Sequence, residues 1–369
     1  MPRLPQCSAV RRPVWGWGSP SFGGPPNCAP CGRSSPATSP PCWRWRVPLF
    51  WRPYLYLVRK KKKRGNRLLN QPDYQTKSAF VAIVGKPNVG KSSLLNALVG
   101  EKVAIVSNKP QTTRNRITGV LTRGETQMVF IDTPGLHKPR TKLSEYMNKQ
   151  VTDSVADVDV AVLVVEPEEE IQKPEQELLE SFRAQRLPAI LVINKIDTLE
   201  SKEPLMGQIQ RYAQAFPFAA VVPISALRKD GVEELFQELE KFASPSPFFF
   251  DEDTLTDQPE RVIVAEIVRE KLLRCLFDEI PHGTAVSVER MRERPDGSMM
   301  DIEVQIYCER ASHKGMIIGK GGEMLKKIAT QSRRDIERFL GCRVNLQCWV
   351  KVSEDWRNRE NVIRSFGYN

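Results

Sequence analysis

From residue 77 onward, short apolar runs alternate with stretches in which apolar residues recur every three or four positions. The short runs are typical of buried strands, and the longer spacing is typical of amphipathic helices. The predicted strands are 79–84, 117–122, 127–131, 160–165, 189–193 and 219–224, and the clearest predicted helices are 143–155, 175–184 and 232–242. This alternation predicts an α/β domain with a mostly parallel sheet covered by helices on both faces.

Two of the predicted strands break the alternation, because only residues 123–126 separate 117–122 from 127–131. A connection this short joins antiparallel neighbours, since a parallel crossover needs about a dozen residues or more. We therefore expect an antiparallel hairpin at one edge of the sheet.

A second and smaller pattern begins after a Pro-rich and acidic linker. It predicts, in order, a helix at 260–277, strands at 285–291 and 300–308, a Gly-rich stretch at 315–322, a basic helix at 323–340 and a last strand at 344–352. The predicted boundaries are 77–244 for the first domain, 245–259 for the linker and 260–369 for a small α+β domain.

Charge separates the chain into three parts. Residues 1–72 contain fourteen Lys and Arg and no Asp or Glu, residues 73–259 have a net charge of −6, and residues 260–369 have a net charge of +3. An acidic middle followed by a mildly basic end favours nucleic-acid contact by the last domain. No run of about 18 apolar residues occurs, so no membrane-spanning helix is predicted.

The first part, 1–76, is rich in Pro and Trp and has no hydrophobic period, so we expect a disordered basic extension. Three interpretations compete. It resembles an organelle transit peptide in being rich in Arg and free of acid, although its Pro density opposes an amphipathic helix. It also resembles a basic arm for RNA or a membrane surface. The third interpretation fits best, in which it is a translated upstream region before a start at Leu68 or Leu69.

The first predicted strand is followed by Gly85-Lys86-Pro87-Asn88-Val89-Gly90-Lys91-Ser92, which fits the phosphate-loop pattern G-x-x-x-x-G-K-[ST] between a strand and a helix. Gly85 and Gly90 allow backbone N–H groups to wrap closely around phosphate oxygens, and the helix start adds a favourable dipole. We expect Lys91 to neutralise the β- and γ-phosphates and the Ser92 hydroxyl to ligate Mg²⁺.

Two further stretches complete a predicted magnesium and γ-phosphate site. Asp132-Thr133-Pro134-Gly135 closes a strand, so Asp132 is expected to hold Mg²⁺ through water and the Gly135 N–H to meet the γ-phosphate. In Gln111-Thr112-Thr113-Arg114, Thr113 is the candidate for a second hydroxyl on Mg²⁺, ordered only with triphosphate. The predicted catalytic residues are Lys91, Thr113 and Gly135.

Two positions modify this picture. Leu136 follows Gly135, where many small GTPases have a Gln that orients water, so intrinsic hydrolysis should be slow or use another device. Asn88 lies inside the phosphate loop, where it could help coordinate a monovalent cation or simply cap the loop.

Guanine selectivity is predicted from Asn194-Lys195-Ile196-Asp197, which ends another strand. The Asp197 carboxylate can accept hydrogen bonds from guanine N1–H and N2–H₂, whereas adenine would leave that charge unpaired. Ser225-Ala226-Leu227 is expected to close the base pocket. Each of these stretches alone is a weak signal, but together, in this order and at strand ends, they indicate a GTP site.

The last domain contains Gly319-Lys320-Gly321-Gly322, which matches the GXXG loop with which KH domains clamp the backbone of single-stranded nucleic acid. Apolar Ile317 and Ile318 precede the loop, and a helix with Lys326, Lys327, Arg333, Arg334 and Arg338 follows it. The loop, the two isoleucines and the side chains of Lys326, Lys327, Arg333 and Arg334 are predicted to bind RNA, with bases on the apolar groove and phosphates at the glycines.

Residues 77–369 resemble the Era family, GTPases of the TrmE-Era-EngA-like superfamily that carry a C-terminal type II KH domain. The resemblance rests on 85–92, 111–114, 132–136, 194–197 and 225–227, on the GXXG loop after two isoleucines, and on the ending 364–368. It implies GTP hydrolysis with Mg²⁺, binding of the 3′ region of small-subunit (16S-type) ribosomal RNA, and support of 30S subunit biogenesis and 16S rRNA processing by a monomer. The family lacks the catalytic Gln, in agreement with Leu136.

The resemblance also implies a K⁺ role for Asn88 and a cytoplasmic location with loose association at the inner face of the membrane. Residues 1–72 have no counterpart in the family core, so an organelle matrix is the alternative location if they form a transit peptide. Two other functions agree less well with the sequence. A metabolic kinase is disfavoured by Asp197, and a GTP switch whose last domain binds protein is disfavoured by the GXXG loop and basic helix.

Overall fold

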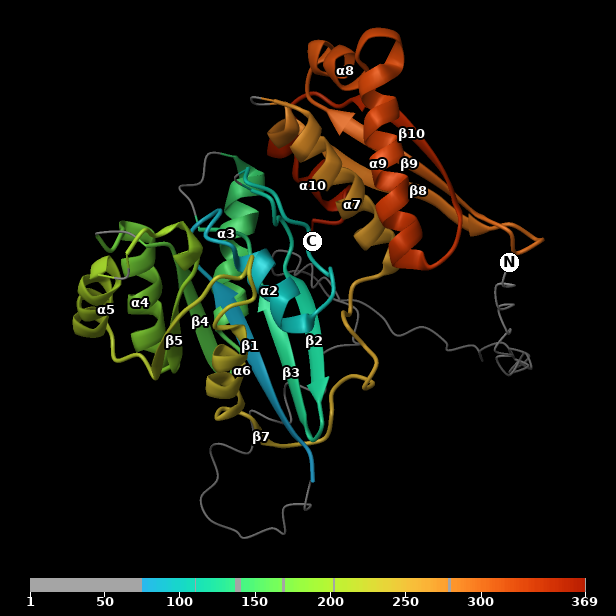
Figure 1. The fold of residues 1–369 in the computed structure, drawn as a ribbon. Helices are drawn as coiled ribbons and strands as arrows, with labels where there is room; N and C mark the ends of the chain where they lie inside the picture. Colours follow the sequence, from blue (N-terminus) through green and yellow to red (C-terminus); the bar gives the residue numbers. More distant parts are fainter. Residues whose placement is uncertain are drawn as a thin grey trace, which may run out of the picture. The chain divides into compact units, whose positions relative to one another are not determined.

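The computed structural model describes residues 75–109, 111–136, 141–167, 170–201, 203–277 and 280–368. The expected basic extension, 1–76, lies outside the described residues except for its last two positions. The described part contains two sheets, one in each of the two domains that the sequence predicts (Figure 1).

The first sheet has the strand order β2-β3-β1-β4-β5-β6. Its strands are β1 (Lys77–Val84), β2 (Ile117–Arg123), β3 (Thr126–Asp132), β4 (Val160–Val165), β5 (Ala189–Ile193), β6 (Ala220–Pro223) and the short β7 (Ser244–Pro245). All neighbours are parallel except β2 with β3 and β7 with β1. This confirms the mostly parallel sheet and the antiparallel hairpin at one edge.

Helices cover both faces of this sheet. They are α2 (Lys91–Val99), α3 (Lys142–Val155), α4 (Lys173–Gln185), α5 (Glu203–Ala215) and α6 (Val232–Glu240). Alternate residues of β1 enter two different cores, because Val81 and Ile83 pack with α2 and α6, whereas Ala82 and Val84 pack with α3, α4 and α5. Burial on both faces explains why these strands read as continuous apolar runs.

The second sheet has the order β10-β9-β8 and forms a smaller α+β domain. Its elements are α7 (Glu260–Cys275), β8 (Ala285–Glu293), β9 (Met300–Cys308), α8 (Ala311–Ile318), α9 (Glu323–Leu340), β10 (Val344–Val352) and α10 (Glu360–Ser365). Strand β9 pairs antiparallel with β8 and parallel with β10. Helices α7 and α9 pack against one another and against the sheet, which gives this domain its own core (Figure 1).

Several elements differ from the sequence prediction. Helices α5, α8 and α10 and strand β7 were not predicted, and α6 and α7 end two residues earlier than expected, at Glu240 and Cys275. Pro204 and Gly207 obscured the pattern of α5, although Pro is tolerated in the first turn of a helix. Residues 315–318, the first half of the Gly-rich stretch at 315–322, belong to α8, which ends just before Gly319, a residue with a φ of 75°.

Among the described residues, no helix combines the length and apolar character that crossing a bilayer requires.

Candidate functional site

The predicted nucleotide-binding residues gather where strands of the first sheet end. Strand β1 has β3 on one side and β4 on the other, so the connections leave in opposite directions at its carboxyl end. Ligands of open α/β sheets bind at such a switch point. The phosphate loop follows β1, Asp132 ends β3, Asn194 follows β5 and Ser225 follows β6. The topology therefore brings four distant sequence stretches to one edge.

The two glycines of the phosphate loop are required by the surrounding backbone and side chains. A Cβ on Gly85 would lie 2.3 Å from the Val164 carbonyl oxygen, and a Cβ on Gly90 would lie 2.2 Å from Asn194 Nδ2. Both residues also have a positive φ, 149° and 97°, which side-chain-bearing residues rarely adopt. The loop can therefore approach its neighbours closely only because these positions lack a side chain.

Lys91 lies under the phosphate loop rather than in solvent. Its Nζ donates hydrogen bonds to the carbonyl oxygens of Gly85, at 3.1 Å, and Lys86, at 2.7 Å. Burial lowers the pKa of Lys91 to about 8, and the nearby charge of Asp132 partly offsets this effect. The ammonium is thus held at the centre of the loop, where the charge of a bound phosphate would compensate its desolvation.

Ser92, Thr113 and Asp132 form a cluster of oxygen atoms beside Lys91. Ser92 Oγ donates to Asp132 Oδ2 at 2.6 Å and lies 2.8 Å from Thr113 Oγ1, which is 3.4 Å from the same carboxylate oxygen. The other carboxylate oxygen, Oδ1, is buried and has no hydrogen-bond partner of normal geometry in the described part of the chain.

The electrostatics of this cluster fit a bound cation. Burial raises the pKa of Asp132 to about 6, against the opposing charge of Lys91 and the hydrogen bonds from Ser92 and Thr113. A carboxylate without a full set of partners in such a place gains from a cation, and two hydroxyls plus a carboxylate are the hard oxygen ligands that Mg²⁺ prefers. The residues present therefore fit the predicted magnesium site.

Gly135 lies directly against the phosphate loop. A Cβ on Gly135 would be 2.5 Å from the Cα of Pro87, and the next residue, Leu136, donates its N–H to the Gly85 carbonyl oxygen at 3.3 Å. On the other side of this turn, Thr133 Oγ1 donates to the Ile83 carbonyl oxygen at 2.9 Å. The Asp-Thr-Pro-Gly turn is thereby fixed to the end of β1, next to the γ-phosphate position that the motif predicts.

The predicted base pocket is assembled by Asn194, Asp197 and the stretch from Ser225. Asn194 is buried, donates to the Val89 carbonyl oxygen at 2.8 Å and accepts from the Ala226 N–H at 3.0 Å, so it ties the phosphate loop to the pocket. Ser225 Oγ donates to one oxygen of Asp197 at 2.6 Å. Leu227, in contrast, is 84% exposed, so the closing stretch contributes backbone and Ala226 more than the leucine side chain.

Three neighbours of the site were not predicted from the sequence. Glu175 on α4 is 1% exposed and pairs with Lys86 at 3.3 Å, and Glu166 after β4 pairs with Lys195. Asn108 accepts a hydrogen bond through its carbonyl oxygen from Asn88 Nδ2 at 3.0 Å. None of the three belongs to a motif. Only the position of Glu166 at a strand end could have indicated a place near the site.

The GXXG loop lies between α8 and α9. Gly319, Gly321 and Gly322 all have a positive φ, of 75°, 57° and 82°, so the loop turns sharply and brings its backbone to the surface. Lys320 is exposed and Ile318 half-buried, whereas Ile317 is fully buried in the core of the domain. Ile317 thus supports the loop from beneath and offers no surface to a base.

The helix after the loop has one basic, exposed face. Ile328, Ser332 and Ile336 point into the domain, and the side chains of Lys326, Lys327, Arg333 and Arg334 lie on the exposed side. A hollow of about 360 Å³ on this side is lined by Glu323, Lys326, Lys327, Thr330, Gln331 and Arg334. Lys326, Lys327 and Arg334, three of the predicted RNA-binding residues, therefore share one hollow on α9, which begins directly after the GXXG loop.

Comparison with known proteins identifies both domains. A family model described as 50S ribosome-binding GTPase matches residues 80–195, and a KH domain model matches residues 279–357. The sequence is 50% identical over 293 residues to GTPase Era of Clostridioides difficile (strain 630), which covers 79% of this chain and 99% of that protein. It is 49% identical over 292 residues to GTPase Era of Clostridium botulinum (strain Alaska E43 / Type E3), covering 79% and 98%. The chain belongs to the Era family of GTPases.

Solved structures of Era superpose on the chain with a TM-score of 0.77 at 38% identity, covering 79% of this chain and 99% of theirs. One is a variant of Aquifex aeolicus Era bound to GDP·AlF₄⁻, and the other is Era in complex with MgGDPNP and nucleotides 1506–1542 of 16S ribosomal RNA. Like its Era relatives, this chain is a GTPase, with a P-loop domain followed by a KH domain.

Proposed function

We propose that this Era-family GTPase binds the 3′ region of small-subunit, 16S-type ribosomal RNA through its KH domain and supports 30S subunit biogenesis and 16S rRNA processing. The observation that carries the proposal is the GXXG loop and basic face of α9 in the same chain as a GTPase site. The relative that was solved with nucleotides 1506–1542 supports this choice of RNA. The division of labour follows the predicted boundaries: GTP at 77–244, a linker at 245–259 and RNA at 260–369.

The nucleotide site works by positioning and by charge compensation. The N–H groups of the phosphate loop and the Lys91 ammonium hold the phosphates, and the carboxylate of Asp197 accepts the guanine N1–H and N2–H₂ groups. The Gly135 N–H meets the γ-phosphate from the other side. The side chain of Leu136 has no hydrogen-bonding group to orient the attacking water, so we expect slow intrinsic hydrolysis.

The oxygen cluster of Ser92, Thr113 and Asp132 would hold Mg²⁺, with the two hydroxyls as direct ligands and Asp132 acting through water. When bound with the nucleotide, this ion neutralises charge on the β- and γ-phosphates. The side-chain oxygen of Asn88 would coordinate K⁺ near the phosphates, while its Nδ2 keeps the hydrogen bond to Asn108.

The RNA site combines a backbone clamp with a charged strip. The turns at Gly319, Gly321 and Gly322 let the sugar-phosphate backbone come close to the protein main chain, and Ile318 offers an apolar edge to a base. Lys320, Lys326, Lys327, Arg333 and Arg334 add the positive charge that dominates affinity for nucleic acid. In this proposal the protein acts as a cytoplasmic monomer on the 30S subunit, with peripheral association at the membrane.

Binding of the full chain to a labelled RNA that carries the 3′ end of small-subunit ribosomal RNA tests the proposal. The titration is run at one fixed salt concentration, because phosphate contacts make affinity depend on salt. A scrambled RNA of the same length and composition is the matched control. We expect clearly tighter binding to the 3′-end sequence than to the scrambled RNA.

Two results would contradict the proposal in different ways. Equal affinity for both RNAs would leave a nucleic-acid-binding GTPase without the proposed target. Absence of binding to either RNA, in protein that still binds GTP, would instead favour the rival in which the KH domain recognises a protein.

A further inference from the structure

Helix α7 of the KH domain contacts the backbone on the N-terminal side of Thr113. The Arg269 guanidinium donates hydrogen bonds to the carbonyl oxygens of Gln111, at 3.5 Å, and Thr112. Arg269 is only 1% exposed, and its charge is balanced by Glu266 one turn earlier, which accepts from Nε at 2.8 Å. A buried guanidinium with a fixed carboxylate partner has little freedom, so its donors define where the two carbonyl groups lie.

On the C-terminal side of Thr113 the contact runs the other way, because a side chain of the GTPase domain donates to the KH domain. Arg114 belongs to the GTPase domain, but its side chain extends to the KH domain, and the residue is 1% exposed. Its guanidinium donates to the carbonyl oxygens of Thr284, at 2.6 Å, and His282, at 3.0 Å. It also donates to Tyr368 Oη at 3.3 Å and lies 5.6 Å from the ring centre of Trp356. Thr113 is therefore held between two arginines that belong to opposite domains.

The beginning of the same segment is attached to α7 as well. Glu270 is fully buried, pairs with Lys102 at 2.6 Å and accepts from the Val106 N–H at 3.3 Å. Arg274 donates to the Val106 carbonyl oxygen at 3.1 Å. The described residues between Lys102 and Arg114 thus have polar contacts to the KH domain near each end of the segment.

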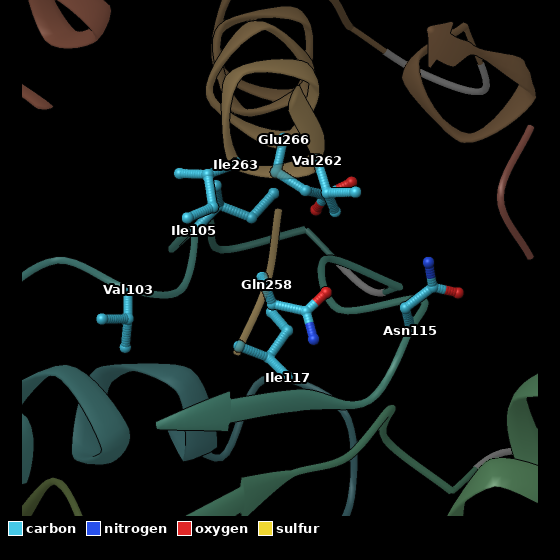
Figure 2. A pocket seen from close by; sticks show the side chains of 8 residues that line it. All are labelled: Val103, Ile105, Asn115, Ile117, Gln258, Val262, Ile263 and Glu266. Carbon is cyan, nitrogen blue, oxygen red and sulfur yellow. The ribbon is translucent and has the colours of Figure 1, made fainter. Parts of the chain in front are cut away.

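Figure 2 shows the packing between these contacts. A cavity of about 20 Å³, room for a single water molecule, is lined by Val103, Ile105, Asn115, Ile117, Gln258, Val262, Ile263 and Glu266. Ile105 of the segment and Ile263 of α7 lie next to one another in its lining (Figure 2). Because this void is small and mostly apolar, the segment packs closely on α7 and a shift of the helix would be transmitted to it.

We propose that Arg269 and Arg114 are positioning residues for GTP hydrolysis, through which the KH domain completes the GTPase site. They fix the main chain on both sides of Thr113, and this places Thr113 Oγ1 at 2.8 Å from Ser92 Oγ in the oxygen cluster. Neither arginine touches the cluster itself, so both act through the backbone of Thr113. The inference rests on the proposed magnesium role of Thr113.

The test compares GTP hydrolysis by the full chain and by Arg269→Met, which removes the donors while keeping an unbranched side chain. The matched control is Arg261→Met on the same helix, because Arg261 is exposed and, in the described part of the chain, donates within its own domain, to the carbonyl oxygens of Val288 and Glu289. We expect Arg269→Met to lower kcat about tenfold or more, the scale of a small misplacement in a catalytic site. We expect the magnesium concentration for half-maximal activity to rise, and GDP affinity to stay unchanged.

A general loss of structure would lower GDP affinity, so the combined readout separates positioning from folding. Arg269→Lys and Arg114→Lys keep the charge but lose the planar fork of donors. In both variants we expect the magnesium concentration for half-maximal activity to rise, but by less than in Arg269→Met. These two conservative variants decide the matter if Arg269→Met no longer binds GDP. Wild-type kcat and magnesium requirement in both of them would overturn the inference.

Thr113→Ala distinguishes failure of this inference from failure of the function on which it rests. If Thr113→Ala has a low kcat and a raised magnesium requirement while the arginine variants behave as wild type, the arginines do not position Thr113 and the proposed site stands. If Thr113→Ala itself behaves as wild type, the proposed magnesium role of Thr113 fails, and the present inference fails with it.

Discussion

Asp197 is the single residue on which guanine selectivity depends in the proposed site. Ser225 Oγ fixes one carboxylate oxygen at 2.6 Å, so the carboxylate has a defined orientation. Asp197 lies two residues after Lys195, whose φ of 66° turns the chain sharply after β5. A side chain held in this way can accept two hydrogen bonds from one base edge, and a base that lacks those donors leaves it unpaired.

Asp197→Asn is expected to change the preferred nucleotide from GTP to xanthosine triphosphate. Xanthine carries a carbonyl group where guanine has its N2 amine, and the new amide can donate to that carbonyl. We expect GTP affinity to fall about a hundredfold or more, as for other buried polar mismatches, while affinity for xanthosine triphosphate rises. Competition against a fluorescent guanine nucleotide measures both constants.

The control for this exchange is Asp157→Asn, an exposed carboxylate outside the site. It should leave both affinities unchanged. Loss of GTP affinity in Asp197→Asn with no gain for the xanthine nucleotide would count against a direct contact between Asp197 and the base.

Single residues of the site were predictable where a motif fixes their role, and only there. Ser92, Thr113 and Asp132 come from three separate stretches, yet the order of motifs was sufficient to predict that they would meet. Glu175 was not predictable, because its pairing with Lys86 depends on the angle at which α4 packs on the sheet. Sequence spacing carries no information on that angle.

At the level of elements, the sequence predicted those with a strong period and missed those stabilised by their surroundings. Strands β4, β5, β9 and β10 and helix α9 have the predicted bounds, since each buries a regular set of apolar positions. Helix α8 has eight residues, includes Gly315 and buries only Ile317. Too short to be stable alone, such a helix forms because the domain packs against it and Gly319 ends it.

The loop between α8 and α9 offers a clean test of RNA binding. Gly319→Asp is a poor choice, because a Cβ there would lie 2.8 Å from Met324 Cβ and distort the loop itself. Gly321 has a φ of 57° and open space where a Cβ would be added, and Asp tolerates that conformation better than most residues. Gly321→Asp therefore adds a negative charge at the proposed phosphate clamp with little strain.

Gly321→Asp is expected to weaken RNA binding about tenfold or more and to leave GTP hydrolysis without RNA unchanged. Gly341→Asp is the matched control, since Gly341 ends the same helix with a φ of 68° and equally open surroundings. Fluorescence anisotropy with the 3′-end RNA measures the effect. Equal RNA affinity in the two variants would remove the GXXG loop from the binding surface.

At the scale of the whole molecule, two segments of the proposed magnesium and γ-phosphate site are linked to the KH domain. The segment around Thr113 contacts α7, and helix α3, which follows the Asp132–Leu136 turn, packs its Leu143 and Met147 against Trp356, Ile363 and Tyr368. These contacts could not be predicted from the sequence. They join residues far apart in the sequence, 157 positions for Thr112 and Arg269, and the partners of α3 lie in a short 3₁₀ helix, in the short α10 and near the end of the chain.

This arrangement predicts that RNA affinity depends on the bound nucleotide. A triphosphate with Mg²⁺ would fix Thr113, and the contacts with Arg269 would then favour one placement of α7. Helix α7 is in turn connected to α9, the helix that faces the RNA in the proposal, because Lys271 pairs with Asp335. We therefore expect the 3′-end RNA to bind about fivefold tighter or more with a non-hydrolysable GTP analogue than with GDP, the scale of ordinary coupling between sites.

Arg269→Met is expected to abolish that difference, whereas Arg261→Met should retain it. Coupling between two binding equilibria is reciprocal, so the RNA must also shift the ratio of the affinities for the GTP analogue and for GDP by the same factor in the wild-type chain. Measuring both the effect of the nucleotide on RNA affinity and the effect of RNA on nucleotide affinity therefore provides an internal control. If RNA affinity is equal with both nucleotides in the wild-type chain, the KH domain binds RNA independently of the GTPase site, and the contacts of α7 would then serve hydrolysis alone. If the difference exists but survives in Arg269→Met, other contacts between the two domains carry the coupling, among them those of Arg114 and the packing of α3 on Trp356 and Tyr368.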